Sequence, residues 1–321
     1  MERREFLKAV GAAGAGAILE ALSGCDSGDK NRQQASTGKY PMRTLGKTGE
    51  RVSIIAFGGL ALAGVGQDEA DSIVGYAIDK GINYFDVAPT YGDAELKMGP
   101  ALKPYRDRVF LACKTAKRDR EGAQQELDRS LERLGTDHFD LYQLHHITDV
   151  EKDVKKALGK NGAMEAILEA RKQGVIRYIG FSAHSAQAAL AAMKEFDFDT
   201  VMFPVNFVCH FKNGFETKIL TEAKKQKLGI IALKAMAKQN WADNPDKSQC
   251  PRCWYEPIVE PHLIKNALGW TLSQEISVTI PPSDTRLFRQ AVELAPTCTP
   301  PTKQVLEQLN QIASASNPIF G

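Results

Sequence analysis

The sequence predicts an α/β protein whose main body is an eight-stranded (β/α)8 barrel preceded by an N-terminal β-hairpin. From Tyr40 onwards, short runs rich in β-branched and aromatic residues alternate with longer amphipathic runs. Glycine follows most of the amphipathic runs, and eight such units in about 250 residues suit a closed barrel. An open doubly wound sheet is the alternative, but no Gly-x-Gly-x-x-Gly opens the first unit.

The β-rich runs predict one hairpin and eight strands. Met42–Leu45 and Arg51–Ile54 are expected to pair through the turn Lys47-Thr48-Gly49. The strands of the barrel are expected at Ile54–Gly58, Tyr84–Asp86, Val109–Lys114, Phe139–Leu144, Tyr178–Ser182, Thr200–Pro204, Ile230–Leu233 and Val278–Ile280. Strands separated by helices are parallel, so their carboxyl ends meet at one rim. In a TIM barrel that rim carries the active site.

Several amphipathic runs end at a glycine, which supplies the left-handed residue that closes a helix. The predicted helices and their stop signals are Asp71–Lys80 before Gly81, Gln124–Leu134 before Gly135, Met164–Gln173 before Gly174, and Phe215–Lys227 before Gly229. The run Thr302–Ala313 predicts one more amphipathic helix, lying over the barrel or reaching toward its mouth.

The first 39 residues do not fit the barrel pattern. Arg3-Arg4 precede a weakly hydrophobic Ala/Gly run, which ends in Leu22-Ser23-Gly24-Cys25. Residues 1–25 resemble a twin-arginine export signal with a lipobox, which predicts a periplasmic or cell-envelope protein anchored by a lipid on Cys25. Residues 26–39 are polar and predict a flexible tether. The alternative is a short amphipathic helix of a cytoplasmic protein, and Glu20 favours it.

Composition and charge bear on which partners the protein could bind. The chain has 321 residues and a formal net charge of +2. Without a basic cluster we expect no nucleic-acid partner, and without an apolar run of about 18 residues we expect membrane contact only through the lipidated N-terminus. The barrel is expected to occupy residues 40–296, followed by a C-terminal helix and tail over 297–321. Composition does not decide the oligomeric state.

Four chemically capable side chains follow successive predicted strands. Asp86 ends the second strand and Tyr91 lies in the loop after it, while Lys114 ends the third strand and His145 follows the fourth. Each by itself is compatible with capping, packing or a solvated surface. Because neighbouring strands lie about 5 Å apart, the four side chains can meet at one rim. Their joint placement predicts a site.

Four segments also resemble a known family. They are Gly81–Gly92, Cys113-Lys114-Thr115, Asp140–His145 and Gly174–Ser182. In order and spacing they resemble the aldo-keto reductases, from about Arg43 to Leu294. The resemblance implies an NAD(P)-dependent oxidoreductase that reduces an aldehyde or ketone, or oxidises the alcohol. It places the catalytic tetrad on Asp86, Tyr91, Lys114 and His145.

The chemistry explains why these four groups are needed. Hydride arriving at a carbonyl carbon leaves charge on the oxygen, so a positioned acid must supply a proton. Tyr91 is the expected donor, Lys114 is expected to lower its pKa, and Asp86 is expected to hold the Lys114 ammonium. A neutral His145 would orient the carbonyl oxygen.

The resemblance implies cofactor contacts along the same rim. Ser182 matches a residue that contacts the nicotinamide amide, and Asn206 lies near the amide-binding region. The other implied contacts are Gly59, Lys234, Met236, Ala237, Pro281, Ser283 and Arg286. NADP(H) is favoured over NAD(H), because Arg286 and Arg289 suit an adenosine phosphate. For both arginines, a solvated helix face is the alternative.

Some positions depart from the family pattern. Ser182-Ala183-His184 replaces the usual Ser-Asn, Met202 or Phe203 stands where a Gln is expected, and Val205 replaces an aromatic residue, with Phe207 nearby. These departures affect cofactor contacts rather than the tetrad. They bear on affinity and on the choice between NADPH and NADH.

The six cysteines are too few for a disulfide scaffold, and one Cys-x-x-Cys supplies too few ligands for zinc or an iron–sulfur cluster. We therefore expect no metal, and predict a Cys250–Cys253 disulfide or a pairing with Cys298. Trp254 and Tyr255 are expected to wall the substrate pocket, with simple packing as the alternative. The loops expected to set specificity are Leu60–Gly66, Asn206–Gly214 and Lys238–Pro257.

Two other functions remain open. One is a cofactor-binding barrel that senses redox state or binds a partner with little turnover. The other is a metal-dependent hydrolase that uses His145 and His146. The unsubstituted tetrad favours the reductase, which would act on a small carbonyl substrate.

Overall fold

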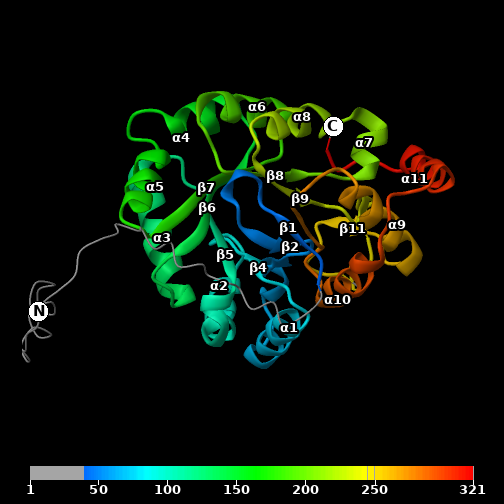
Figure 1. Ribbon diagram of the computed structural model, residues 1–321, viewed down its shortest axis with the longest axis horizontal. Helices are drawn as coiled ribbons and strands as arrows, with labels where there is room; N and C mark the ends of the chain where they lie inside the picture. The colour runs from blue at the N-terminus through cyan, green and yellow to red at the C-terminus, as the bar shows by residue number, and fades with distance from the viewer. Residues whose placement is uncertain (1–39, 244, 249, 321) are drawn as a thin grey trace, which may run out of the picture. The chain divides into compact units, whose positions relative to one another are not determined.

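The computed structural model describes residues 40–243, 245–248 and 250–320 of the chain. The predicted signal and tether, with Cys25, lie outside the described residues. Eight parallel strands form one sheet in the order β12-β9-β8-β7-β6-β5-β4-β3 (Figure 1). Their bounds are β3 (Phe57–Gly58), β4 (Tyr84–Asp86), β5 (Phe110–Thr115), β6 (Phe139–Ile147), β7 (Ile176–Ala183), β8 (Thr200–Pro204), β9 (Gly229–Leu233) and β12 (Val278–Ile280). The predicted (β/α)8 barrel is confirmed.

The sheet closes where its first and last strands meet. Ile55 forms a parallel bridge with Thr279. The amide of Ala56 donates to the Thr279 carbonyl at 2.9 Å, and the Thr279 amide donates to the Ile54 carbonyl at 3.0 Å. The predicted strand Ile54–Gly58 is therefore shortened to β3, because residues 54–56 make these closing contacts instead of a continuous ladder.

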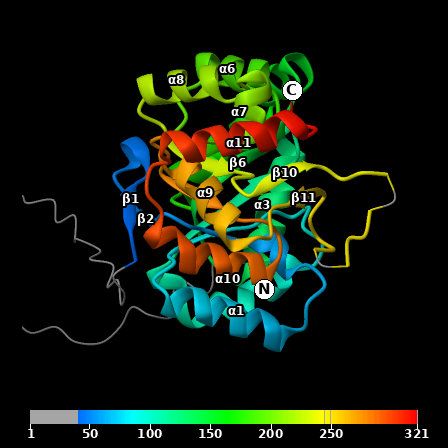
Figure 2. The same ribbon diagram turned by 90° about the vertical axis from the view of Figure 1, so that its right-hand side faces the viewer.

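Helices connect the strands and cover the outside of the sheet (Figures 1 and 2). They are α1 (Gln67–Asp79), α2 (Ala94–Leu102), α3 (Arg120–Leu134), α4 (Lys156–Leu158), α5 (Ala163–Lys172), α6 (Ala186–Glu195), α7 (Phe207–Asn213), α8 (Thr217–Lys225), α9 (Pro261–Leu272), α10 (Thr285–Leu294) and α11 (Lys303–Ala315). Gly81, Gly135 and Gly174 adopt the predicted left-handed conformation after α1, α3 and α5. The predicted C-terminal helix is α11, which packs on α7 and α9.

One predicted stop signal is wrong. After α8 the left-handed residue is Lys227, at φ 57°, and Gly229 begins β9. Position 229 requires glycine for a different reason: a Cβ there would lie 2.7 Å from two side-chain atoms of Leu45. The glycine lets the hairpin approach the start of β9.

The N-terminal hairpin closes the amino-terminal end of the barrel. β1 (Met42–Thr44) and β2 (Arg51–Ser53) pair antiparallel, as predicted. Leu45 follows β1 and is fully buried in a cluster with interior residues such as Tyr84 and Ile231. The Lys47 amide donates to the Lys227 carbonyl at 2.7 Å. The closed end leaves the opposite, carboxyl-terminal rim as the place for a site.

The segments around that rim differ from the predicted loops. Asn206–Gly214 is not a loop, because Asn206 caps the helix α7. Within Lys238–Pro257, the ends pair as β10 (Ala237–Asn240) and β11 (Tyr255–Pro257). The C-terminal tail reaches this rim as well, since the ring of Phe320 lies 4.9 Å from the ring of His184.

The predicted disulfide is not formed. Cys250, Cys253 and Cys298 are free thiols among the described residues. Burial raises the pKa of Cys253 to about 12, which favours the thiol. Cys298 instead donates to the carbonyl of Lys265 at 3.4 Å. In the described part of the chain, no helix has the length and apolar character needed to cross a membrane.

We predict that Leu45→Ala lowers the free energy of unfolding by about 2–5 kcal/mol, because it opens a cavity under the barrel interior. Leu96→Ala serves as the matched control, since Leu96 lies in α2 and is 51% exposed. Denaturant titration measures both. An equal, small effect of the two substitutions would contradict a hairpin that packs into the barrel.

Candidate active site

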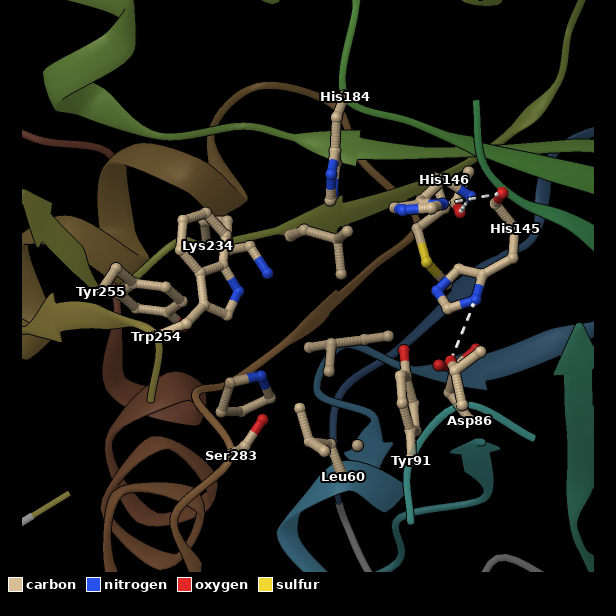
Figure 3. A pocket seen from close by; sticks show the side chains of 17 residues that line it. Leu60, Asp86, Tyr91, His145, His146, His184, Lys234, Trp254, Tyr255 and Ser283 are labelled. Atoms are coloured by element: carbon tan, nitrogen blue, oxygen red, sulfur yellow. Dashed lines mark hydrogen bonds between the residues drawn. The ribbon is translucent and has the colours of Figure 1, made fainter. Parts of the chain in front are cut away.

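The predicted catalytic residues meet at the carboxyl-terminal rim. Asp86, Tyr91 and His145 line one cavity of about 360 Å³ (Figure 3). Lys114, from the neighbouring strand β5, lies fully buried directly behind them. The strand pairing brings them together, because Asp86 pairs with Ala112 and Lys114 pairs with Gln143.

Asp86 and Lys114 form a buried ion pair. The Lys114 ammonium donates to the Asp86 carboxylate, and also to the Val87 carbonyl at 3.1 Å. Burial raises the pKa of the Asp86 carboxyl, and the ammonium offsets only part of this effect. Burial alone would lower the pKa of Lys114, but Asp86 and Tyr91 raise it above its ordinary value. Lys114 is therefore held as a cation.

Tyr91 is surrounded by the other three groups. The Lys114 ammonium lies 5.2 Å from the centre of its ring, and the His145 ring meets it edge-on at 5.7 Å. Burial raises the pKa of Tyr91, although Lys114 acts in the opposite direction. The expectation that Lys114 brings this pKa below its ordinary value is wrong in net direction, because the cost of burying a phenolate outweighs the attraction. Tyr91 is thus a protonated phenol at neutral pH.

His145 is neutral. Burial lowers its pKa well below the ordinary value, and the Lys114 charge adds to the effect. The backbone at this point is tied to the barrel, since Arg118 donates to the His145 carbonyl at 2.7 Å. His146 adopts φ 44°, and its amide donates to the Ser182 hydroxyl at 2.6 Å. This turn sets the direction of the His145 ring.

The predicted cofactor residues separate into two groups. Ser182, Lys234, Pro281 and Ser283 line the cavity. The remaining predicted residues lie outside its lining: Gly59, Asn206, Met236, Ala237 and Arg286. Met236 and Ala237 are buried in the core. Position 59 requires glycine, because a Cβ there would lie 2.8 Å from the Asp86 carbonyl oxygen.

The Asn206 side chain is occupied by the backbone rather than directed to a ligand. Its amide nitrogen donates to the carbonyls of Lys234 at 2.9 Å and Ala237 at 2.7 Å. Its oxygen accepts from the Cys209 amide at 3.0 Å. We correct the expectation that it contacts the cofactor: Asn206 joins the start of α7 to the segment after β9.

The two arginines of α10 already have partners. Arg286 pairs with Asp284 at 3.3 Å and remains 61% exposed. Arg289 lies 4.0 Å from the centre of the Tyr76 ring. Asp284 also accepts from the first amides of α10. A phosphate bound at Arg286 would also lie near the Asp284 carboxylate, which would repel it.

Sequence reasoning missed part of the cavity wall. The missed lining residues are Thr90, Leu233 and Ile280, whereas Leu60 lies in a predicted specificity loop, and Met202 and His184 were noted only as departures from the family pattern. Gln143 was missed too, and its amide donates to Asp86 at 3.4 Å. An apolar residue at a strand end looks the same in the sequence whether it lines a cavity or packs in the core. The one available signal was Met202, which stands where the family pattern has a Gln. Trp254 and Tyr255 do line the cavity, as expected.

The alternative of a metal-dependent hydrolase requires a set of metal ligands around His145 and His146. No three His, Cys, Asp or Glu side chains in the part of the chain that the structure describes are placed to hold a metal ion. His145 instead contacts Thr90 at 3.4 Å, and His146 faces His184 at 5.8 Å between ring centres.

We predict that Lys114→Met lowers the free energy of unfolding by about 3–5 kcal/mol, because it leaves the Asp86 carboxyl buried without its partner. The double variant Asp86→Asn with Lys114→Met should recover much of this loss. Denaturant unfolding at neutral pH measures both. A double variant as unstable as Lys114→Met alone would rule out the uncompensated carboxylate as the cause.

Comparison with known proteins agrees with this geometry. A model of the Aldo/keto reductase family matches residues 54–253. The aldo-keto reductase YhdN of Bacillus subtilis is 32% identical over 207 residues, covering 59% of this chain and 60% of the relative. L-galactose dehydrogenase of Arabidopsis thaliana is 27% identical over 219 residues, covering 62% and 66%. The chain thus spans less than two thirds of the length of these curated relatives.

A solved structure shows the same fold. The aldo-keto reductase of Bacillus halodurans in its holo form superposes with a TM-score of 0.67 at 22% sequence identity, covering 87% of this chain and 98% of that one. The family model matches more than half of the present chain. The chain belongs to the aldo/keto reductase family.

Proposed function

We propose that this protein is an NAD(P)-dependent oxidoreductase that reduces an aldehyde or ketone, or oxidises the corresponding alcohol. One observation carries the proposal: a protonated phenol, a buried ammonium–carboxylate pair and a neutral imidazole meet at one cavity. These are the groups that carbonyl reduction by hydride transfer needs.

The cavity fits the nicotinamide end of such a cofactor. Met202, Leu233 and Ile280 supply apolar walls against which a flat ring can pack. The Ser182 hydroxyl accepts from the His146 amide, so its own proton remains for an amide oxygen. When bound, the nicotinamide supplies or accepts the hydride.

The residues of the chain manage the proton and the carbonyl oxygen. Tyr91 donates its proton to the oxygen as negative charge develops there. Lys114 stabilises the phenolate that remains, and Asp86 holds Lys114 in place. The neutral His145 donates a hydrogen bond to the same oxygen and thereby orients the carbonyl group.

We retain NADP(H) as the preferred cofactor. Ser283 at the cavity and the exposed Arg286 beside it support this preference, because a guanidinium can pair with an adenosine phosphate. The ion pair with Asp284 works against it by lowering the net positive charge around Arg286. The alternative, a cofactor-binding sensor with little turnover, is supported by the departures from the family's cofactor contacts at Ala183, Met202 and Val205. Turnover measurements decide between the two functions.

We predict that Tyr91→Phe lowers kcat for carbonyl reduction by about 10²–10⁴-fold and leaves the cofactor Kd nearly unchanged, because only the proton donor is removed. Steady-state kinetics and fluorescence titration with NADPH measure the two quantities. Tyr105→Phe is the matched control, since Tyr105 stacks with Arg108 away from the cavity. Normal turnover by Tyr91→Phe would overturn the proposal.

We further propose that the N-terminal segment directs export and that Cys25 carries a lipid anchor, on the strength of the sequence pattern alone. Cys25→Ser should then move the protein from the membrane fraction to the soluble fraction of the cell envelope. Fractionation and metabolic labelling with a fatty acid measure this, with Cys298→Ser as control. Identical behaviour of the two variants would contradict lipidation at Cys25.

A further inference from the structure

His145 lies at a point where strand pairing no longer holds the chain. The pairing of β6 with β5 ends at Leu144, and the pairing of β6 with β7 is interrupted between Leu144 and Ile147. Within this interruption His146 has φ 44°, a left-handed value that residues with side chains rarely adopt. The backbone groups of the two histidines therefore need partners outside the strand ladder.

Arg118 supplies the partner of the His145 carbonyl. Its guanidinium donates to that carbonyl at 2.7 Å and to the carbonyl of Ala116 at 3.2 Å. Ala116 directly follows β5, and His145 lies near the end of β6, so one side chain joins the exits of two neighbouring strands. Arg118 is only 8% exposed. Its guanidinium thus acts on the backbone of the rim.

An ion pair fixes the direction of this guanidinium. The Arg118 Nε donates to the Asp153 carboxylate at 3.0 Å. Asp153 belongs to the π-helix Val150–Lys155, which follows β6. Its carboxylate also accepts from the backbone amides of Thr148 at 2.7 Å and Asp149 at 3.0 Å. Because the carboxylate is held by the backbone, the planar guanidinium that pairs with it has little freedom to turn.

The chain that carries Arg118 is anchored as well. The buried Glu126 of α3 accepts from the Ala116 amide at 2.8 Å. The Arg118 carbonyl accepts from the Ala163 amide at 2.9 Å. The arginine therefore extends from a fixed backbone to the His145 carbonyl, and it can hold the histidine against that fixed point.

We propose that Arg118 is a positioning residue: by holding the His145 carbonyl, it directs the His145 imidazole at the carbonyl oxygen of the substrate. This inference rests on the proposed function, in which His145 donates to that oxygen. Arg118 is not among the residues that line the cavity, so its effect on the reaction passes through His145. The His145 and Tyr91 rings lie 5.7 Å apart at the cavity (Figure 3), and a displaced ring would separate the two donors.

A second arginine offers a matched control at the opposite end of the same two strands. Arg106 donates to the carbonyls of Val109 at 3.3 Å and His138 at 2.9 Å. It also pairs with Asp140 at 3.2 Å. Val109 and His138 directly precede β5 and β6. The two arginines thus have the same kinds of partner, but Arg106 lies at the amino-terminal end of the barrel, away from the cavity.

The kinetic test uses the full chain with saturating NADPH and the activated aldehyde 4-nitrobenzaldehyde. Arg118→Met should lower kcat by about 10- to 100-fold and change the aldehyde KM less, because His145 acts as charge develops on the oxygen. Arg118→Lys should recover kcat in part, since an ammonium can still donate to the His145 carbonyl. Arg106→Met should lower the denaturant midpoint as Arg118→Met does, but leave kcat unchanged.

A double-mutant cycle tests whether Arg118 acts through His145. In the His145→Gln background, Arg118→Met should cause little further loss of kcat, because the group that it positions is gone. Losses that multiply in full would show that Arg118 acts elsewhere and would overturn the proposal. An equal fall in kcat for Arg106→Met and Arg118→Met would assign both to fold stability and overturn it too.

A spectroscopic measurement gives an answer without turnover. NMR spectra of the full chain labelled with nitrogen-15 histidine report on each imidazole, and His145→Gln identifies the His145 signals. Arg118→Met should shift these signals, whereas Arg106→Met should leave them in place. If no aldehyde is reduced, such a shift still supports the positioning of His145, and only the proposed function fails. Signals unchanged in Arg118→Met overturn the positioning role. Should Arg118→Met not fold, Arg118→Lys and Arg106→Lys are compared by the same criteria.

Discussion

The buried pair of Lys114 and Asp86 is the constraint on which the site depends. Burying one charge without the other is strongly unfavourable, so the two side chains require adjacent parallel strands in the observed register. The same register places Tyr91 just beyond β4 and His145 at the end of β6. The pair therefore links barrel closure to the chemistry at the rim, and it keeps a cation beside the phenol.

The cavity above this pair is built by segments that lie far apart in the chain. The β10–β11 region contributes Trp254 and Tyr255, while the end of β9 contributes Lys234. Phe320 packs against Trp254 and His184 from the C-terminal tail. Asp86, Tyr91 and His145 thus form one side of the cavity, whereas Lys234, Trp254 and Tyr255 stand on the opposite side.

The cofactor contacts illustrate the limits of residue-by-residue resemblance. Ser182, near the end of β7, and Ser283, in the loop after β12, both line the cavity. Asn206 does not, since its amide serves three backbone groups and so ties α7 to the turn of Lys234. The position of Asn206 in the chain matched an expected cofactor contact. Its hydrogen bonds hold the backbone turn at Lys234 instead.

The sequence by itself determined the succession of strands along the chain, the closing glycines of α1, α3 and α5, and the identity of the four catalytic candidates. These features depend on local patterns: β-rich runs, closing glycines, and polar residues at strand ends. The tertiary structure alone decided that Gly229 serves the contact with Leu45 and that burial raises the pKa of Tyr91. It also decided that Lys234 lines the cavity beside the Trp254 and Tyr255 rings. The physical reason is that burial, electrostatics and cavity shape arise between residues distant in the chain, and no local pattern encodes those distances.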